Sequence, residues 1–336
     1  MKNTIEFVQS RPLDVICLGR LAVDLYAQQI GSPLEDVSSF AKYLGGSSAN
    51  IAFGTARLGL KSAMLSKVGD DHMGRFLTDT LAKEGCDVSH VGIDPERLTA
   101  LVMLGIKDKN TFPLIFYREN CADMAIEASA VDAAFIASSK ALLITGTHFS
   151  TAAMHGVSTQ ALKLARANNV RTVLDIDYRP VLWGLSGKAD GETRFVSNDG
   201  VTRHMQAILP LFDLVVGTEE EFMIAGGGAD IMASLRAVRA AGLVVPAVAL
   251  TSVAGLLDSQ LAKAPSVRVV LHSSRRERFI CKRSKGEIRR YGKGKAQPAL
   301  LRSGAGAGFC LTCVVTHQRG YRPQSKFKNS YARPTP

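Results

Sequence analysis

The sequence is short of cysteines and has no long apolar run. Its 336 residues contain six cysteines, too few for a disulfide framework in a chain of this length, so we expect reduced thiols and a cytoplasmic protein. The apolar, uncharged run of residues 241–257 spans 17 residues and contains Pro246, which is less than the roughly 20 apolar residues of a membrane-spanning helix. The first residues, MKNTIEFVQSRPLDV, lack the apolar core of a cleavable leader. We therefore expect neither a membrane anchor nor a leader.

Acidic residues are nearly absent from the last part of the chain. Residues 241–336 contain 18 Lys and Arg but only 3 Asp and Glu, a net charge of +15, whereas residues 1–240 contain 23 and 27, a net charge of −4. These two values give the +11 of the whole chain. The first part has the balance of an ordinary metabolic enzyme. We expect one domain over residues 1–240 and an atypical, basic and partly disordered tail over residues 241–336.

Residues 1–240 alternate short β-branched runs with helical patterns, as parallel strands joined by crossover helices do. One helix is predicted to begin at Asp71 and to end at Gly85. Five runs are predicted to be strands: residues 14–19, 62–69, 141–146, 170–177 and 212–217. A second helix is predicted from apolar residues at three- and four-residue spacing, namely Met154, Val157, Ala161, Leu164 and Ala165.

Two further runs, residues 99–108 and 113–120, have strand composition but no helix between them. They predict an antiparallel pair outside the parallel sheet, which would form a small lid. The predicted fold class is therefore α/β, with a twisted, mainly parallel sheet, helices on both faces and a small β lid. No fold is assigned to residues 241–336, where neither the strand period nor the helix period is found.

The stretch LGGSSANIAFGTARLGL is the first with a chemical signal. Gly45 and Gly46 let the backbone approach a ligand, and Asn50 offers a donor and an acceptor at the start of a helix. A glycine turn before a buried helix accounts for this stretch equally well. Asp24 lies upstream in GRLAVDLY, and KVGDDHMG follows downstream. Together these runs resemble the first signature of the ribokinase-like (PfkB) carbohydrate kinases. The resemblance implies a sugar site made of Asp24, Gly45, Gly46 and Asn50.

Two later motifs extend the resemblance. LDIDYRPVLW is similar to the family's Asp-x-Asn-x-Arg run, with Asp177 in place of the asparagine and Arg179 retained. Ligands of parallel sheets lie beyond the carboxyl ends of the strands, so Arg179 is placed for an anionic substrate or phosphate. FDLVVGTEEEF is similar to the family's Asn-x-x-Glu run, with Thr218 for the asparagine. The resemblance implies that Glu221 organises magnesium and phosphate, although a solvated helix start also explains the glutamate triplet.

From Arg20 to Gly226 the chain most resembles those family members that phosphorylate the sugar acid 5-dehydro-2-deoxy-D-gluconate in inositol catabolism. A kinase of 2-keto-3-deoxygluconate is the alternative within the family. A guanidinium at Arg118, in the predicted lid, suits the carboxylate of such a substrate, but pairing with Glu119 or another surface acid fits its position equally well. The resemblance also implies ATP and Mg²⁺ as cofactors and a homodimer formed through the lid.

The resemblance breaks at the family's last motif, Gly-Ala-Gly-Asp. Its backbone amides stabilise the transferred phosphoryl group, and its aspartate takes the proton of the substrate hydroxyl. Here the sequence is RSGAGAGFCLTCVV, so Gly304, Ala305 and Gly306 are candidates for the anion hole, whereas Ala307 occupies the position of the aspartate. The strand and glycine loop that cover the nucleotide are not recognised between residues 241 and 303 either. No catalytic base is therefore intact in the sequence.

Three accounts of residues 241–336 stay open. A frame change or truncation near residue 241 explains the charge, the lost periodicity and the lost motifs together, and we favour it. A pseudokinase that binds a sugar acid without transferring phosphate is the second account. A nucleic-acid-binding tail is the third, although no RNA- or DNA-binding motif accompanies the charge. Cys310, Cys313 and His317 resemble half of a zinc site but have no evident fourth ligand, so we expect no metal there.

Overall fold

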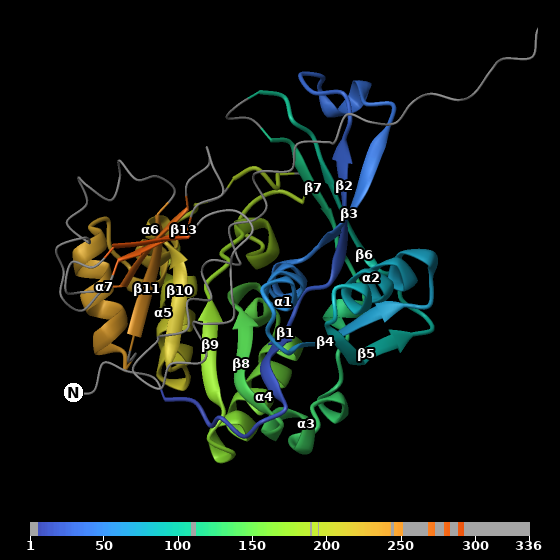
Figure 1. The fold of residues 1–336 in the computed structure, drawn as a ribbon. Helices are drawn as coiled ribbons and strands as arrows, with labels where there is room; N and C mark the ends of the chain where they lie inside the picture. Colours follow the sequence, from blue (N-terminus) through green and yellow to red (C-terminus); the bar gives the residue numbers. More distant parts are fainter. Residues whose placement is uncertain are drawn as a thin grey trace, which may run out of the picture.

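The computed structural model describes residues 6–108, 112–188, 190–193, 195–242, 245–250, 268–272, 279–282 and 288–291. Its centre is a ten-stranded sheet with the order β14-β13-β12-β11-β10-β9-β8-β1-β4-β5 (Figure 1). Every neighbouring pair from β12 to β5 is parallel, whereas the pairs β12–β13 and β13–β14 are antiparallel. The strands are β1 (Leu13–Leu18), β4 (Ser62–Gly69), β5 (Asp87–Asp94), β8 (Ser139–Thr145), β9 (Arg171–Asp175), β10 (Leu214–Thr218), β11 (Val245–Leu250), β12 (Arg268–His272), β13 (Phe279–Lys282) and β14 (Ile288–Tyr291).

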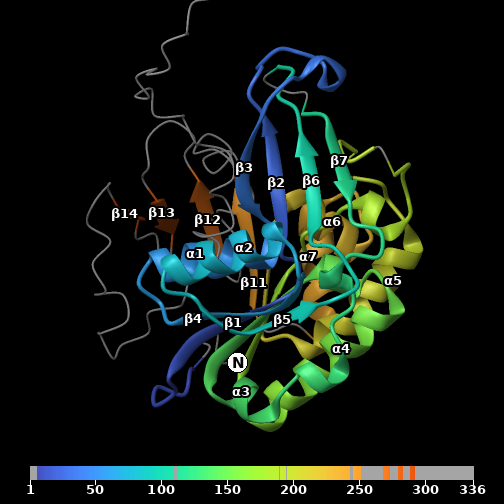
Figure 2. The same ribbon diagram turned by 90° about the vertical axis from the view of Figure 1, so that its right-hand side faces the viewer.

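Helices cover both faces of this sheet (Figure 2). Side chains of a strand alternate between its faces, and in β1 Ile16 and Leu18 face the core under α3 to α7, whereas Val15 and Cys17 face the core under α1 and α2. The helices are α1 (Ser47–Arg57), α2 (His72–Lys83), α3 (Ala133–Ala137), α4 (Ala152–Ala167), α5 (Asp199–Ile208), α6 (Glu219–Gly226) and α7 (Ile231–Ala240). Short 3₁₀ turns are η1 (Leu34–Asp36), η2 (Ala122–Met124), η3 (Ala128–Ala130), η4 (Gly146–Phe149), η5 (Pro180–Trp183) and η6 (Leu209–Leu211). The predicted α/β class is confirmed.

A second sheet stands away from the first and forms the lid (Figures 1 and 2). It has four strands in the order β3-β2-β6-β7. They are β2 (Ala22–Ala27), β3 (Phe40–Gly45), β6 (Ala100–Leu104) and β7 (Leu114–Tyr117). The antiparallel β6–β7 pair was predicted and is confirmed. The sequence did not reveal β2 and β3, so the lid is larger than expected and Asp24 lies within one of its strands.

The sheet continues past the predicted boundary at residue 240. Strand β11 pairs in parallel with β10, in register from Leu214 and Val245 onward. Strands β12 to β14 extend the same sheet. The proposed anion hole, Gly304 to Gly306, and Ala307 lie outside the described residues. The division of the chain at residue 240 therefore remains a prediction.

The loop after η5 joins the main sheet to the lid. The Gly191 amide donates to the carbonyl oxygen of Leu114 in β7 at 2.9 Å. A Cβ at Gly191 would lie 2.2 Å from that oxygen, so only glycine allows this approach. At the other end of the loop, the Tyr178 hydroxyl donates to the carbonyl oxygen of Val196 at 2.6 Å. The loop is thereby attached both to the lid and to the segment that follows β9.

Helix α2 starts after Asp71 and ends before Gly85, as predicted. The Asp71 side chain caps this helix and also bonds to the lid. Asp71 Oδ1 accepts hydrogen bonds from the amides of Met73 and Gly74 at 2.8 and 2.7 Å. The same carboxylate accepts from the amide and hydroxyl of Thr99, at 2.8 and 2.9 Å, just before lid strand β6. Burial opposes ionisation, but the bonds from Thr99, Gly74 and Met73 outweigh it and lower the pKa of Asp71. One side chain thus joins α2 to the lid.

We expect Asp71→Ala to lower the free energy of unfolding by about 2–4 kcal/mol, because it removes a helix cap and leaves two partners at Thr99 without an acceptor. Asp230→Ala is the matched control, since Asp230 caps α7 through the amide of Ala233, and it should cost only about 1 kcal/mol. Urea unfolding measures both. Because the pKa of Asp71 is lowered in the fold, its contribution is present above about pH 4 and is lost as the pH falls through the folded pKa. Equal losses in the two variants would contradict the bridging role.

None of the helices in the described part of the chain has both the length and the apolar character needed to cross a bilayer.

Candidate functional site

The candidate site lies where the carboxyl ends of neighbouring parallel strands meet. Arg20 follows β1, Thr147 follows β8, Asp177 and Arg179 follow β9, and Glu221 lies in the first turn of α6 after β10. Strands β1, β8, β9 and β10 are adjacent in the sheet, so residues far apart in the sequence converge on one edge. This is the edge at which open parallel sheets bind their ligands.

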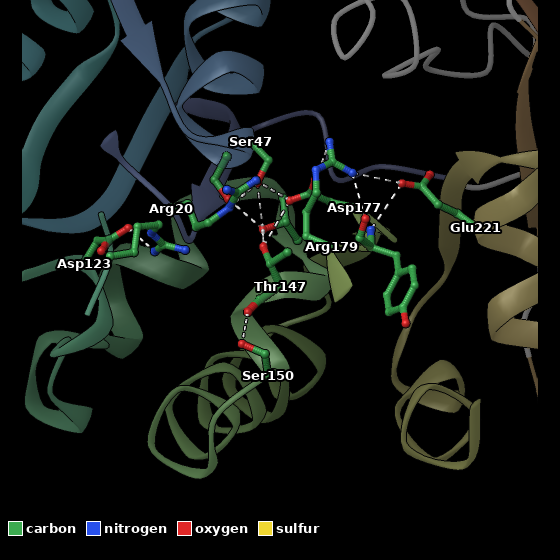
Figure 3. A network of polar contacts seen from close by, with 12 residues as sticks. Arg20, Ser47, Asp123, Thr147, Ser150, Asp177, Arg179 and Glu221 are labelled. Atoms are coloured by element: carbon green, nitrogen blue, oxygen red, sulfur yellow. Dashed lines mark hydrogen bonds and ion pairs between the residues drawn. The ribbon is translucent and has the colours of Figure 1, made fainter. Parts of the chain in front are cut away.

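Asp177 is the centre of the polar network (Figure 3). Its Oδ2 atom accepts from Arg20 Nη2 at 2.7 Å and from the Thr147 hydroxyl at 3.0 Å. Arg20 also donates to the Ser47 hydroxyl at the start of α1, at 3.1 and 3.2 Å. Asp177 has a φ of 35°, a left-handed conformation that Asn and Asp adopt more readily than most residues. The chain therefore leaves β9 at this point, and the strand ends two residues earlier than the sequence pattern predicts.

Arg179 lies between two carboxylates. Its Nη2 is 3.4 Å from Asp177 Oδ1, and its Nη1 is 3.8 Å from Glu221 Oε1. Glu221 is fixed by the backbone, because Oε2 accepts from the Thr218 amide at 2.8 Å and Oε1 from the Tyr178 amide at 3.2 Å. Thr218 in turn accepts from the Glu221 amide, which completes a capping box. The glutamate triplet is thus a helix start whose third residue is buried and faces Arg179.

Burial and the crowding of charges shift the acidities at this edge in opposite directions. Burial opposes ionisation of Asp177, but Arg20 and Arg179 outweigh it and lower its pKa to about 2. Burial raises the pKa of Asp175, and the nearby Asp177 and Glu221 raise it further. Burial also raises the pKa of Glu221, against the attraction of Arg179. The two guanidinium groups therefore hold Asp177 in its ionised form.

Asp24 is a buried carboxylate in lid strand β2. Burial raises its pKa to about 7, although the charge of Arg20 acts in the other direction. A Cβ at Gly45 would lie 2.0 Å from Asp24 Oδ1, so the glycine makes room for this carboxylate. Gly46 has a φ of 89°, and a Cβ there would lie 2.5 Å from the Arg20 carbonyl oxygen. Both glycines predicted for the site are thus required by its geometry.

Two further predicted residues have buried polar atoms without partners in the described part of the chain. They are Asn50, at Nδ2, and Arg118, at Nε. Arg118 forms a buried ion pair with Asp123, whose Oδ1 is also unsatisfied among these residues. Glu119 pairs instead with Lys188 at 2.7 Å. The acid that pairs with Arg118 is therefore a buried one, not the surface neighbour considered from the sequence.

The sequence did not single out Arg20, Ser47, Thr147 or Asp175. Arg20 and Thr147 each come within two residues of the end of a buried strand, and this placement is the signal that could have indicated them. Among the residues that the structure describes, no group of three or more His, Cys, Asp or Glu side chains has the arrangement of a metal site.

Comparison with known proteins identifies the class to which this fold belongs. The pfkB family carbohydrate kinases match residues 13–243, so the chain belongs to this family, as its motifs predicted. A protein named 5-dehydro-2-deoxygluconokinase from Geobacillus kaustophilus (strain HTA426) is 38% identical over 219 residues, which cover 65% of this chain and 62% of that protein. The chain thus spans less than two thirds of the length of this curated relative.

Solved structures show the same fold. A PfkB protein from Polaromonas sp. JS666 is 26% identical, with a TM-score of 0.63 over 83% of this chain and 82% of that chain. A putative ribokinase II from E. coli, solved in complex with ATP and Mg²⁺, is 17% identical, with a TM-score of 0.62 over 85% of this chain and 80% of that chain. At that identity the second structure supports the fold alone.

Proposed function

We propose that this chain carries the sugar-acid site of an ATP- and magnesium-dependent kinase, and that its ligand is 5-dehydro-2-deoxy-D-gluconate, phosphorylated at the terminal hydroxyl. The proposal is carried by one observation: a buried carboxylate and a network of guanidinium groups lie together at the carboxyl edge of the main sheet. Asp24 is a buried carboxylate suited to hydroxyl groups, and it lies within the field of Arg20, which belongs to the guanidinium network around Asp177. A ligand with both hydroxyls and a carboxylate fits such a site. The name of the curated relative supports the same substrate.

The described residues have separate tasks in this proposal. Asp24 accepts hydrogen bonds from sugar hydroxyls, and Arg179 pairs with an anionic group of the ligand or with phosphate. Glu221 orients Arg179, because both of its oxygens are already fixed by backbone amides. Asn50 and Arg118 have unsatisfied N–H groups among the described residues, which suits them to further ligand contacts.

The site fits ATP and Mg²⁺ by the chemistry of its donors. Carboxylate oxygens are ligands that Mg²⁺ accepts, and Glu221 stands beside a guanidinium that suits phosphate. When bound, ATP and Mg²⁺ supply the phosphoryl group and neutralise its developing charge. The residues expected to stabilise that charge, Gly304 to Gly306, lie outside the described residues. A cytoplasmic location and a homodimer formed through the lid belong to the same proposal.

A second candidate is a sugar-acid-binding pseudokinase. Ala307 favours it, because alanine has no group that accepts a proton where the family has an aspartate. The two candidates share the ligand site and differ only in phosphoryl transfer.

Calorimetric titration with 5-dehydro-2-deoxy-D-gluconate tests the ligand site in the full chain. Asp24→Ala and Arg179→Ala should each weaken binding by about 10- to 100-fold, because a charge-assisted hydrogen bond contributes about 1.5–3 kcal/mol. Arg57→Ala is the control, since Arg57 pairs with Glu84 on the exposed surface, and it should bind as the unaltered chain does. Unchanged affinity in both site variants would rule out this assignment.

A further inference from the structure

The two guanidinium groups at Asp177 are held to different degrees. Arg20 reaches Oδ2 at 2.7 Å, whereas Arg179 stays 3.4 Å from Oδ1 and 3.8 Å from the nearer oxygen of Glu221. The side chain of Arg20 is 7% exposed, but that of Arg179 is 19% exposed. Arg20 is thus the tightly bound partner of the carboxylate. Arg179 Nη1 donates to the carbonyl oxygen of Tyr178 at 2.8 Å, but the ion pairs of Arg179 with Asp177 and Glu221 are no shorter than 3.4 Å, so a ligand can compete for its guanidinium.

Arg20 is also fixed from its other side. Its Nε and Nη2 atoms both donate to the hydroxyl of Ser47, and Ser47 directly follows Gly46, whose φ is 89°. The Arg20 carbonyl oxygen lies where any side chain at residue 46 would collide with it. Movement of the Arg20 side chain away from Asp177 would therefore also break its hydrogen bonds to Ser47 at the start of α1.

The hydrogen bonds that Asp177 already accepts limit how it can pair with Arg179. Asp177 Oδ2 accepts from both Arg20 and Thr147, which leaves only Oδ1 facing Arg179. A parallel two-bond pair between an arginine and a carboxylate needs both oxygens. Occupation of Oδ2 therefore prevents Asp177 from capturing Arg179 in this stronger pair.

We propose that Arg20 is a positioning residue: by engaging the Asp177 carboxylate, it leaves the Arg179 guanidinium available to the anionic group of the ligand. The inference rests on the proposed function, since it concerns the ligand assigned to Arg179 there. The ion pair with Arg20 also explains how a charged aspartate is tolerated at the buried position 177, where the family has an asparagine. Buried charges are tolerated when they are paired, and Arg20 supplies the partner that an uncharged asparagine would not need.

The test compares single and charge-balanced double variants of the full chain, with 5-dehydro-2-deoxy-D-gluconate as the probe in calorimetry. Arg20→Gln should lose about 10- to 100-fold in affinity, because Asp177 then pairs with Arg179 through both oxygens. Arg20→Gln with Asp177→Asn should recover most of that loss, because an uncharged amide at this position no longer captures Arg179. A purely structural role for Arg20 predicts that the affinity falls only as far as the folded fraction does, which urea unfolding of the same variants measures. Arg75→Gln, which breaks an exposed pair with Asp70, is the matched control and should leave the affinity unchanged.

Each outcome decides a different question. Unchanged affinity in Arg20→Gln, or a double variant that binds as weakly as the single one, would overturn the positioning role while the ligand assignment stands. If Arg20→Gln does not fold, the double variant decides, since it buries no unpaired charge: binding close to that of the unaltered chain supports the role, and weak binding overturns it. An unaltered chain that does not bind the sugar acid would overturn the proposed function and, with it, this inference.

Discussion

Asp24→Asn is expected to stabilise the ligand-free protein at pH 8 and to weaken its binding of the sugar acid. Burial raises the pKa of Asp24 to about 7, whereas an aspartate in an unfolded chain has a pKa of about 3.9. Below about pH 4 the group is neutral in both states and costs nothing. As the pH rises from about 4 to about 7 the unfolded chain ionises first, so this group lowers the free energy of unfolding, by about 2–4 kcal/mol at pH 7 and above.

Urea unfolding of both proteins between about pH 4.5 and pH 8 measures this effect. The difference between Asp24→Asn and the unaltered chain should grow with pH and then level off above about pH 7. Asp70→Asn is the control, since Asp70 lies on the exposed surface, and its difference should stay small throughout. A difference for Asp24→Asn that does not depend on pH would contradict the raised pKa. Weaker binding together with higher stability would show that the Asp24 charge destabilises the fold but is needed to bind the ligand.

The second large effect concerns phosphoryl transfer. The chain with its own residues 251–336 should turn over about 10²–10⁴ times more slowly than a family member with an intact catalytic base, because Ala307 cannot accept a proton. Ala307→Asp alone should not restore transfer, since the segment that covers the nucleotide in the family is not recognised in this sequence either. Replacing residues 251–336 by a family-like C-terminal segment should restore it.

A coupled assay of ADP release on the three proteins, with sugar acid, ATP and Mg²⁺ present, measures this outcome. Calorimetric binding of the sugar acid is the control, and it should be similar in all three because Asp24 and Arg179 are unchanged. Near-normal turnover by the unaltered chain would refute the interpretation of the tail as inactive. Rescue by Ala307→Asp alone would identify a pseudokinase with a single missing residue. Sequencing of the coding region around codon 241 tests the frame-change account directly.

The sequence predicted those parts of the fold that local patterns determine. The five β-branched runs became strands of the parallel sheet, and the apolar stripe of Met154, Val157 and Ala161 became the buried face of α4. Strands β2 and β3 were missed because AVDLYA and FAKYLG carry Asp24 and Lys42 among apolar residues. Strand β3 pairs with its neighbour β2, and β2 also pairs with the distant strand β6. Pairing between distant segments overrides such weak local preferences.

In the candidate site, too, the residues within local motifs were predicted and those brought together by the strand order were not. Asp24, Arg179 and Glu221 stand in runs that resemble family motifs, and the structure places Arg179 and Glu221 together at one edge of the sheet. Arg20 and Thr147 belong to no motif that was recognised, and their link to Asp177 spans 157 and 30 residues of sequence. Their importance follows from the order of strands β1, β8 and β9, which the composition of a single segment does not specify.

The attachment of Gly191 to β7 also bears on how the lid avoids unwanted association. The lid has two outer strands, β3 and β7, and an outer strand offers unpaired backbone groups to which a foreign strand can add. At β7 the amide of Gly191 already occupies the carbonyl oxygen of Leu114, so the protein's own loop shields that side from edge-to-edge aggregation. The side formed by β3 carries the exposed Lys42, a charge of the kind that discourages such pairing.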